Sequence, residues 1–278
     1  MIVLITGIYG FLGSYLAKKM FEKHTVIGLY HTEKNIAFQS QITCVNKLEL
    51  IDETPDLIIM CHAAVSSGNA IVDEESLIES NVEFTRQLVK KFPKVKSIYI
   101  SSVSVFGNTE DVISETFPVN PQTPYAKSKL TGEKTVLQNK NSIIIRFSSL
   151  YGNGMKENTL VPNYCNQALD KKSIEVWGTG SRYQNYLHIN DAVNLIVKAA
   201  EYKSKISFPV LGVSSKEYSN NEVAKIISDL TGTQINYTKD DSSLSFHFNN
   251  EMTQNILNWC PETELKNGLK YYLEWKKK

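Results

Sequence analysis

The chain begins with the stretch Met1-Ile2-Val3-Leu4-Ile5-Thr6-Gly7-Ile8-Tyr9-Gly10-Phe11-Leu12-Gly13, an apolar run that leads into three glycines spaced three residues apart. Gly7 allows a tight turn at the end of a strand, and Gly10 leaves room for a diphosphate against the backbone. Gly13 allows the following helix to pack closely on the strand. The positive end of that helix then faces the anion. This stretch therefore predicts a strand–turn–helix unit that binds a diphosphate.

Short apolar runs alternate with helical patterns through the first half of the chain. Five runs are short and continuously apolar, as in strands that are buried on both faces: Ile2–Ile5, Thr25–Leu29, Leu57–Cys61, Ser97–Ile100 and Ser142–Arg146. Between them, apolar residues recur every four positions, as on one face of a helix: Leu12, Leu16 and Met20, and later Phe84, Leu88 and Phe92. This alternation predicts right-handed crossovers and a doubly wound α/β fold around a parallel sheet. In such sheets, ligands bind beyond the carboxyl ends of the strands.

The pattern changes after Tyr151, where loops become longer and more polar and the predicted elements become shorter. The helix predicted at Ile189–Ala200 fits the first part of the chain better than the second. We therefore expect residues 1–151 and 186–206 to form the domain with the parallel sheet. Residues 152–185 and 207–278 are expected to form a smaller, discontinuous α/β lobe that binds the substrate.

The composition excludes several classes of protein. The 278 residues include 30 Lys and Arg and 29 Asp and Glu, a formal charge of +1. A dedicated nucleic-acid binder would carry an excess of positive charge, so we expect no nucleic-acid partner. No stretch of about 20 apolar residues occurs, so we expect neither a membrane span nor a signal peptide. Four cysteines that lie far apart, without metal-ligand spacing, predict free thiols in a reducing cytoplasm and no metal site.

A second motif, Tyr125-Ala126-Lys127-Ser128-Lys129, stands at the start of a predicted helix. Tyr125 and Lys129 are four residues apart, so they share one helix face. A nearby ammonium stabilises a phenolate, which would lower the pKa of Tyr125 and let it exchange a proton near neutral pH. Ser102 follows a predicted central strand, where its hydroxyl can bind a substrate oxygen beside the tyrosine.

Taken in order, these motifs resemble the extended short-chain dehydrogenases/reductases, a family of nucleotide-sugar epimerases, dehydratases and ketoreductases. The resemblance runs along nearly the whole chain and is carried by the segments Thr6–Gly13, His62–Ala64, Ser80–Val82, Ser101–Ser102, Tyr125–Lys129, Arg146, Tyr151–Gly152, Gly178–Gly180, His188–Asp191, Leu257–Pro261 and Glu274–Trp275. It implies a Rossmann-type sheet and an enzyme, either an NAD(P)-dependent oxidoreductase or a nucleotide-sugar epimerase. It also implies a nucleotide-sugar substrate and a homodimer.

The resemblance implies catalytic roles for Ser102, Tyr125 and Lys129. Tyr125 would exchange a proton with the reacting oxygen, Ser102 would hydrogen-bond that oxygen, and Lys129 would hold the nicotinamide ribose. Residues that the resemblance places at the cofactor are Thr6, Gly7, Tyr9, Gly10, Phe11, Leu12, Gly13, Tyr30, His31, Lys34, Ala63, Ala64, Asn81, Tyr125 and Lys129. The residues predicted at the substrate are Ser102, Val103, Tyr125 and Ser149, at positions matched to the family, and Arg182 as a substitute for the family arginine.

One departure from the family concerns the cofactor. The second strand of NAD-binding members ends with an acidic residue that binds the adenosine ribose, but Tyr30 stands at that position here and Glu33 lies three residues further on. Without the carboxylate, a 2′-phosphate is not repelled, and His31 and Lys34 can supply positive charge. The sequence therefore favours NADP(H), with NAD(H) as the alternative.

A second departure restricts the reaction. The dehydratases of the family carry an Asp-Glu pair after the serine strand, and the epimerase-reductases that make GDP-fucose carry a cysteine directly after the serine pair. This chain has Val103-Ser104-Val105, so it lacks both acid/base groups. We therefore predict NADP(H)-dependent reduction of a keto sugar nucleotide, such as a 4-keto-6-deoxyhexose, in deoxysugar or surface-polysaccharide biosynthesis. The alternatives are a C4 epimerase with tightly bound NAD and a non-catalytic dinucleotide sensor.

The contacts to the substrate phosphates also depart from the family. Gln184 stands where members often carry an arginine that binds the pyrophosphate, and Ser149 replaces a frequent asparagine. Arg182 either binds the pyrophosphate from two residues earlier or is a solvated loop charge. Of the other polar residues, His62 is expected to support the loop beneath the cofactor, and Arg146 is expected to anchor loops by ion pairing.

Overall fold

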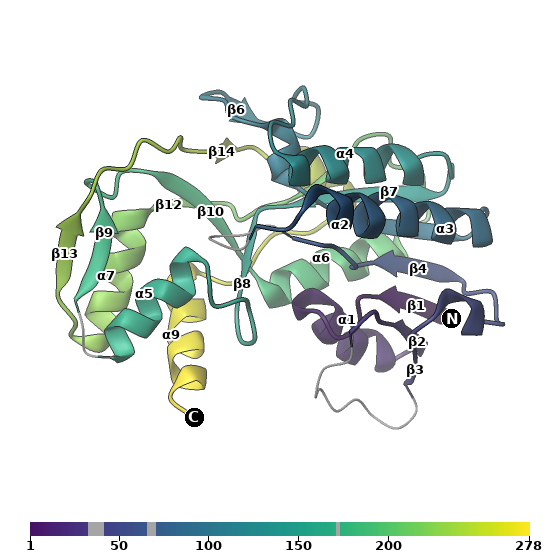
Figure 1. Ribbon diagram of the computed structural model, residues 1–278, viewed down its shortest axis with the longest axis horizontal. Coiled ribbons are helices and arrows are strands. Elements are labelled where there is room, and N and C mark those ends of the chain that lie inside the picture. The colour runs from purple at the N-terminus through teal and green to yellow at the C-terminus, as the bar shows by residue number, and fades with distance from the viewer. Residues whose placement is uncertain (33–41, 66–70, 171–172) are drawn as a thin grey trace.

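The computed structural model describes residues 1–32, 42–65, 71–170 and 173–278. Within these ranges, a large sheet with helices on both faces lies at one end of the molecule, and a smaller lobe of helices and short strands lies at the other (Figure 1). The N-terminus lies beside the sheet, and the C-terminus lies at the end of helix α9 (Leu265–Lys276) in the lobe.

The large sheet contains seven parallel strands in the order β11-β7-β5-β4-β1-β2-β3. Their bounds are Ile2–Thr6 for β1, Thr25–Leu29 for β2, Thr43–Val45 for β3, Leu57–Met60 for β4, Lys96–Ser102 for β5, Ser142–Phe147 for β7 and Val210–Gly212 for β11. The chain adds β2 and β3 on one side of β1, and then returns to add the later strands on the other side. This reversal between β1 and β4 is that of a doubly wound Rossmann-type sheet, so the predicted fold class is confirmed.

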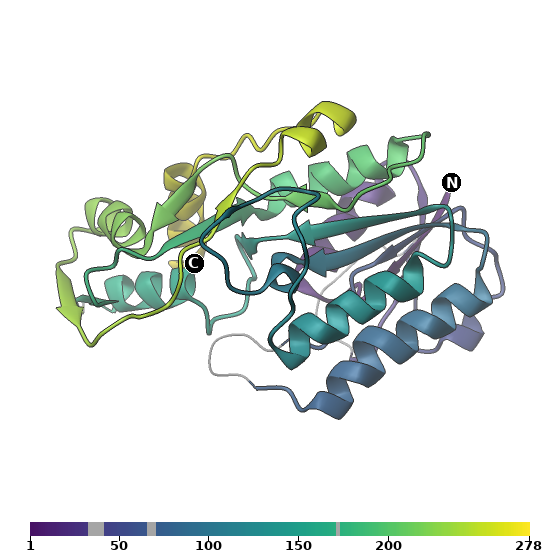
Figure 2. The same cartoon turned by 90° about the horizontal axis from the view of Figure 1, so that it is seen from above.

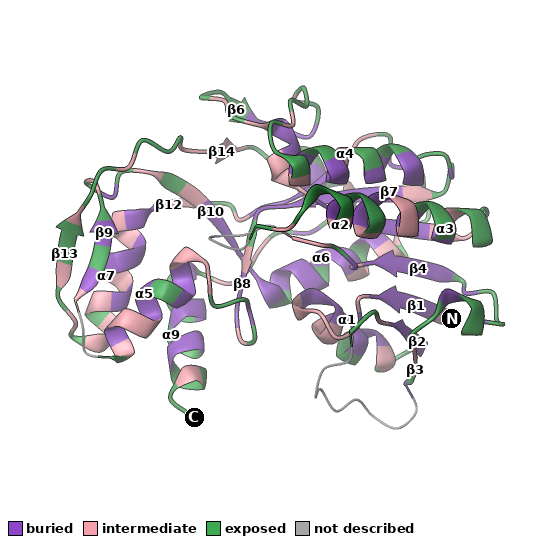
Figure 3. Ribbon diagram, viewed as in Figure 1, coloured by how far each residue is buried: buried purple, intermediate pink, exposed green. Residues whose placement is uncertain are grey.

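Successive residues of each strand pack on opposite faces of the sheet. Val3 and Ile5 belong to the core that helices α1 (Phe11–Phe21) and α6 (Ile189–Glu201) cover, whereas Leu4 belongs to the core beneath α3 (Phe84–Lys91) and α4 (Pro124–Val136). The turned view separates these two helix layers (Figure 2). Because both faces are covered, the central strands are buried along almost their whole length (Figure 3).

Shorter elements connect the sheet with its helices. Their bounds are Leu48–Leu50 for the 3-10 turn η1, Glu74–Ile78 for α2, Glu79–Glu83 for the π-turn η2, Val103–Phe106 for the 3-10 turn η3 and Val112–Ile113 for β6. Helix α2, the π-turn and α3 follow one another without a break. Strand β6 pairs with the distant β14 (His247–Phe248).

The lobe has a hydrophobic core of its own, formed by residues of α5, α7, α9 and the strands β9 and β10. The bounds of its elements are Ser149–Tyr151 for β8, Leu160–Leu169 for α5, Ile174–Trp177 for β9, Tyr183–His188 for β10, Glu217–Ser219 for β12, Asn220–Thr231 for α7 and Ile235–Thr238 for β13. Strand β10 pairs with β8 and β12, and β9 pairs with β13. The lobe strands thus form two small sheets that are separate from the large one.

The structure corrects one part of the predicted division. Residues 207–278 were expected to lie in the lobe, but β11 pairs with β7 of the large sheet, and Leu257 and Trp259 pack in the core beneath α1 and α6. These two residues belong to or follow the short helix α8 (Glu251–Leu257). A three-residue strand and a seven-residue helix are too short to show which core they join. The other predicted boundaries remain predictions.

The described residues contain neither a helix that could span a membrane nor a cluster that could hold a metal ion. Among the helices in the described ranges, none combines the length and the apolar character that crossing a membrane requires. The described residues also place no three His, Cys, Asp or Glu side chains where they could hold a metal ion. The cytoplasmic location and the homodimer remain predictions.

The glycine turn fixes α1 against β1. Gly7 has a φ of +66°, which favours glycine, and its N–H donates to the Leu29 carbonyl at 2.7 Å. A Cβ on Gly13 would lie 2.2 Å from the carbonyl oxygen of Gly7. The helix can therefore approach the strand this closely only if residue 13 has no side chain.

We predict that Gly13→Ala lowers the free energy of unfolding by about 1–3 kcal/mol, because the added methyl must displace the Gly7 backbone. Urea denaturation of both proteins measures this change. Ser14→Ala is the control in the same helix, since it removes only the bond from the Ser14 hydroxyl to the Phe11 carbonyl. It should cost about 1 kcal/mol or less. Equal stability of Gly13→Ala and the wild type would contradict the close contact.

Candidate active site

The carboxyl ends of β1, β4 and β5 meet at one edge of the large sheet. Gly7 follows β1, His62 follows β4, and Ser102 is the last residue of β5. A Cβ on Gly7 would lie 3.0 Å from the backbone of His62, so the first two loops are in close contact. The winding direction reverses between these two strands, which is where doubly wound sheets bind their ligands.

The turn between β1 and α1 fits a diphosphate. Gly10 is the N-cap of α1. Because glycine has no side chain, no N-cap side chain accepts a hydrogen bond from the first N–H groups of the helix. The N–H of Gly10 donates to the Gly7 carbonyl at 2.8 Å. A Cβ on Gly10 would lie 2.9 Å from that oxygen. A helix N-terminus without a side-chain cap, in a turn with no room for a Cβ, matches the recognition of an anion by backbone groups.

The other predicted contacts around this turn differ in what they can offer a ligand. Thr6 and Leu12 are buried, so their side chains contribute to packing and only their backbone can face a cofactor. Tyr9 and Phe11 are partly buried and border the turn. Phe11 packs against both the sheet core and the lobe core.

The end of β2 carries aromatic and basic groups in place of an acid. Tyr30 follows β2, and its N–H donates to the Val45 carbonyl at 3.0 Å. Its ring meets the ring of Tyr9 edge-on, with centroids 5.1 Å apart. His31 is exposed. Residues 30–32 include no carboxylate, while Lys34, predicted for cofactor binding, lies outside the described residues.

His62 has the structural role that the sequence predicted. Its Nδ1 shares a hydrogen bond of 2.6 Å with the Thr6 hydroxyl, and its Nε2 shares one of 3.0 Å with the Thr85 hydroxyl. Because Thr85 donates to a carbonyl, its oxygen accepts from Nε2, and Nδ1 accepts from Thr6. Burial, with the charge of Lys129, lowers the pKa of His62 to about 3, so the ring is neutral. It therefore braces the loops after β1 and β4.

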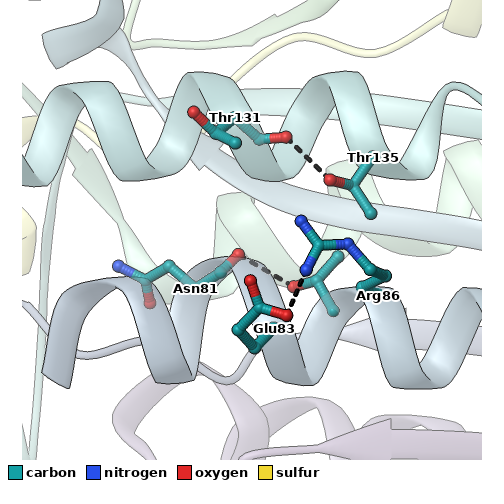
Figure 4. A network of polar contacts seen from close by, with 6 residues as sticks. Asn81, Glu83, Arg86, Thr131 and Thr135 are labelled. Carbon is teal, nitrogen blue, oxygen red and sulfur yellow. Dashed lines mark hydrogen bonds and ion pairs between the residues drawn. The ribbon is translucent and has the colours of Figure 1, made fainter. Parts of the chain in front are cut away.

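Asn81 lies in the π-turn η2 and holds the loop that contains Ala63 and Ala64. Its Oδ1 accepts from the Ala64 N–H at 2.9 Å, and its Nδ2 donates to the Ala64 carbonyl at 3.0 Å and to the Ser128 hydroxyl at 2.9 Å. Its own carbonyl accepts from the Thr85 hydroxyl at 3.0 Å. Figure 4 shows Asn81 on its helix with this bond as a dashed line that leads to an unlabelled side chain. The amide of Asn81 is thus engaged with protein atoms and positions the loop of Ala63 and Ala64, whose contact with a cofactor remains a prediction.

Ser102, Tyr125 and Lys129 come together at the end of β5. Thr123 caps α4 by accepting a hydrogen bond of 3.1 Å from the Ala126 N–H, so the helix begins just before the tyrosine. Tyr125 and Lys129 then lie on one face of α4, four residues apart. Ser102 reaches the tyrosine from β5 and hydrogen-bonds its side chain. This is the constellation that the sequence predicted.

Burial controls the protonation of the tyrosine and the lysine. It raises the pKa of Tyr125 to about 12, partly offset by the hydrogen bond to Ser102. It lowers the pKa of Lys129 to about 7, partly offset first by the charge of Glu133 and then by the Cys61 side chain, whose own pKa burial raises to about 12. The pKa of Tyr125 thus moves in the direction opposite to the predicted one, because desolvation of the phenolate outweighs the hydrogen bond to Ser102.

Tyr99 and Glu133, which the sequence motifs did not single out, complete the surroundings of Lys129. The lysine Nζ lies 4.2 Å from the centroid of the Tyr99 ring, a cation–π contact. A Cβ on Gly132 would lie 2.1 Å from the Tyr99 hydroxyl, so glycine at this position allows α4 to pack on β5. The spacing of Glu133 could have identified it in the sequence. Glu133 follows Lys129 by one helical turn, just as Lys129 follows Tyr125 by one helical turn.

The predicted substrate residues lie in different surroundings. Val103 packs beside the buried Val105 and Phe106 after β5, and Ser149 is exposed on β8. Arg182 is partly exposed, and its Nε donates to the Leu244 carbonyl at 3.2 Å. This bond ties Arg182 to the segment that contains Leu244. Whether these residues contact a substrate remains a prediction.

Gln184, which replaces the expected arginine, is also engaged. Its Nε2 donates to the Asn220 side chain at 2.7 Å. Burial raises the pKa of Tyr186, two residues further along β10, and the charge of Arg182 offsets part of this rise. Arg182 thus supplies positive charge near the part of β10 where the family arginine would stand.

Comparisons with known proteins agree with this geometry. A model of the "NAD dependent epimerase/dehydratase family" matches residues 3–210. YtcB of Bacillus subtilis, described as an uncharacterized UDP-glucose epimerase, is 24% identical over 303 residues that cover 96% of this chain and 95% of YtcB. The UDP-glucuronate 4-epimerase of Thermodesulfobacterium geofontis is 22% identical over 312 residues, 99% of this chain and 95% of that enzyme.

A solved structure shows the same fold. The UDP-glucuronic acid 4-epimerase of Bacillus cereus, in complex with UDP-glucuronic acid and NAD, superposes with a TM-score of 0.87 at 22% identity. The match covers 100% of this chain and 99% of that chain. Together with the family match, it confirms the resemblance seen in the motifs and the expectation of an oxidoreductase or epimerase. The chain belongs to the NAD dependent epimerase/dehydratase family.

Proposed function

We propose that this chain transfers a hydride at one carbon of a nucleotide sugar, and that it reduces a 4-keto-6-deoxyhexose with NADPH. The observation that carries the proposal is the grouping of Ser102, Tyr125 and Lys129 at the end of β5, beside the loops after β1 and β4. The pathway we assign is deoxysugar or surface-polysaccharide biosynthesis.

The residues of the site divide the chemistry between them. When bound, the nicotinamide dinucleotide supplies the hydride. Tyr125 donates its hydroxyl proton to the sugar oxygen as the ketone becomes an alcohol. Ser102 hydrogen-bonds the same oxygen and holds it beside the tyrosine. The ammonium of Lys129 stabilises the phenolate that remains on Tyr125.

The residues after β5 favour chemistry at a single carbon. Elimination of water, or epimerisation next to a ketone, needs an additional acid/base to move protons at a neighbouring carbon. The turn η3 contains Val103, Ser104, Val105 and Phe106, none of which is such a group near neutral pH. Oxidation or reduction of one carbinol needs only the tyrosine.

The end of β2 favours NADPH. Residues 30–32 lack the carboxylate that would bind the adenosine ribose of NAD and repel a 2′-phosphate. The exposed His31 adds a group that can take a positive charge. The lack of a carboxylate at residues 30–32, with His31 nearby, supports the preference for a phosphorylated ribose.

A C4 epimerase that recycles bound NAD is the second candidate. The relatives and the solved structure described above carry the names of UDP-glucose or UDP-glucuronate epimerases, and the solved complex contains NAD. An epimerase oxidises and re-reduces the same carbon, so the same three residues would serve it. The two candidates differ in cofactor: an epimerase retains its dinucleotide and consumes none.

We predict that Tyr125→Phe lowers the rate of reduction by about 100-fold or more, because the proton donor is lost while the ring remains. The decrease in NADPH absorbance with a panel of 4-keto sugar nucleotides measures the rate. Dinucleotide binding, measured by calorimetry, should remain. Wild-type protein that binds dinucleotide but turns over no member of the panel would instead support the sensor alternative.

We predict that the KM for NADPH lies about tenfold or more below the KM for NADH. Tyr30→Asp should reverse this preference by repelling the 2′-phosphate, whereas Tyr30→Asn removes the same ring without adding charge and should not. Steady-state kinetics with both cofactors measure the change. A wild-type protein that prefers NADH, or that is purified with bound NAD and consumes none, would contradict the NADPH reductase and favour the epimerase.

A further inference from the structure

Glu133 forms a buried ion pair beneath the site. Its Oε1 accepts from the Ser101 hydroxyl at 2.5 Å and from Arg146 Nε at 2.9 Å, and its Oε2 accepts from Arg146 Nη2 at 2.7 Å. The side chains of Arg146 and Glu133 are only 6% and 3% exposed. This bidentate geometry fixes the carboxylate between α4, β5 and β7.

The ammonium of Lys129 is buried on the same helix face. Lys129 is 1% exposed and lies one helical turn before Glu133. Desolvation of a lysine disfavours its charged form. Several elements contribute titratable or charged groups around Lys129. These groups are Tyr99 of β5, Cys61 and His62 after β4, Tyr125 and Glu133 of α4, and Arg146 of β7. Among these groups, Glu133 brings the negative charge.

We propose that Glu133 is a positioning residue for the reaction, whose carboxylate keeps Lys129 charged beside Tyr125 while the bidentate contact with Arg146 holds that carboxylate in place. The inference rests on the proposed roles of Tyr125 and Lys129. A purely structural ion pair would tie α4 to the sheet without affecting the lysine.

The protonation of Lys129 makes this distinction measurable. Burial lowers the pKa of Lys129 to about 7, and the charge of Glu133 opposes this decrease. The lysine is therefore protonated below about pH 7 and loses its charge as the pH rises further. An opposite charge at close range typically shifts a pKa by about 1–3 units, so removing Glu133 should move the titration of Lys129 to lower pH. For a decrease of one unit, the charged fraction at pH 7 falls about fivefold.

Three variants separate the electrostatic role from the structural one. Glu133→Gln removes the charge but leaves Arg146 buried and unpaired, which can prevent folding. Glu133→Gln with Arg146→Met removes both charges of the ion pair, so the net charge of the site does not change and neither member of the pair is left buried without its partner. Ser101→Ala is the matched control, since it removes one hydrogen bond to the carboxylate and keeps its charge.

NMR of lysines labelled at the ε-carbon follows the titration of Lys129 in the free protein and needs no substrate. We expect the midpoint to fall by about one unit or more in the folded Glu133 variants, and to remain unchanged in Ser101→Ala. An unchanged midpoint in the folded double variant would overturn the inference.

The pH profile of kcat/KM for reduction is the second measurement. The value of kcat/KM should fall as the pH rises through the titration of Lys129. In the double variant, the pH at which kcat/KM falls should decrease by the same amount as the NMR midpoint of Lys129. A shifted titration with an unshifted kcat/KM profile would overturn the positioning role. If the wild type reduces no substrate, the proposed function fails, and the NMR titration still decides whether Glu133 controls the charge of Lys129.

Discussion

Burying the ammonium of Lys129 is the constraint on which the site depends. A buried charge must be balanced nearby or lose its proton, and here the balance comes from the same helix. Glu133 supplies the negative charge, and its own burial is compensated by the bidentate contact with Arg146. The helix that carries Tyr125 is thereby tied to β5 and β7, so the electrostatics of the site and the packing of α4 on the sheet depend on the same contacts.

The parallel sheet places the other loops of the candidate site near the ammonium of Lys129. The ends of β1, β4 and β5 lie at one edge, and His62, Thr85 and Asn81 connect the loops there through buried hydrogen bonds. A protein with a net charge of +1 has no large overall positive charge that would attract a diphosphate. We propose that the helix N-terminus at Gly10, which has no side-chain cap, provides local attraction instead.

Much of the fold could be predicted from the sequence because its signals are local. Continuous apolar runs predicted β1, β2, β4, β5 and β7, and spacing by four residues predicted α1 and α3. The strands β3 and β11 were missed, since three residues carry no periodicity and their pairing is decided by distant partners. For the same reason, residues 207–278 were predicted to lie wholly in the lobe.

The site was predictable where its residues are neighbours along the chain. Tyr125 and Lys129 follow from helix spacing, and Ser102 from its place after a strand. The pKa of Tyr125 was predicted in the wrong direction, because burial by the surrounding elements cannot be read from a five-residue motif. The role of Glu133 was missed for a related reason, since its partners Ser101 and Arg146 belong to two other strands.

Isotope transfer tests the central claim most directly, namely that a hydride moves between the nicotinamide and one sugar carbon. NADPH carrying two deuterium atoms at C4 of the nicotinamide, so that either transferred hydride is labelled, would be incubated with the protein and a 4-keto-6-deoxy sugar nucleotide, and the product examined by NMR and mass spectrometry. The account predicts one deuterium at C4 of the sugar for each NADPH consumed. A product without deuterium, or NADPH that remains unconsumed, would contradict it.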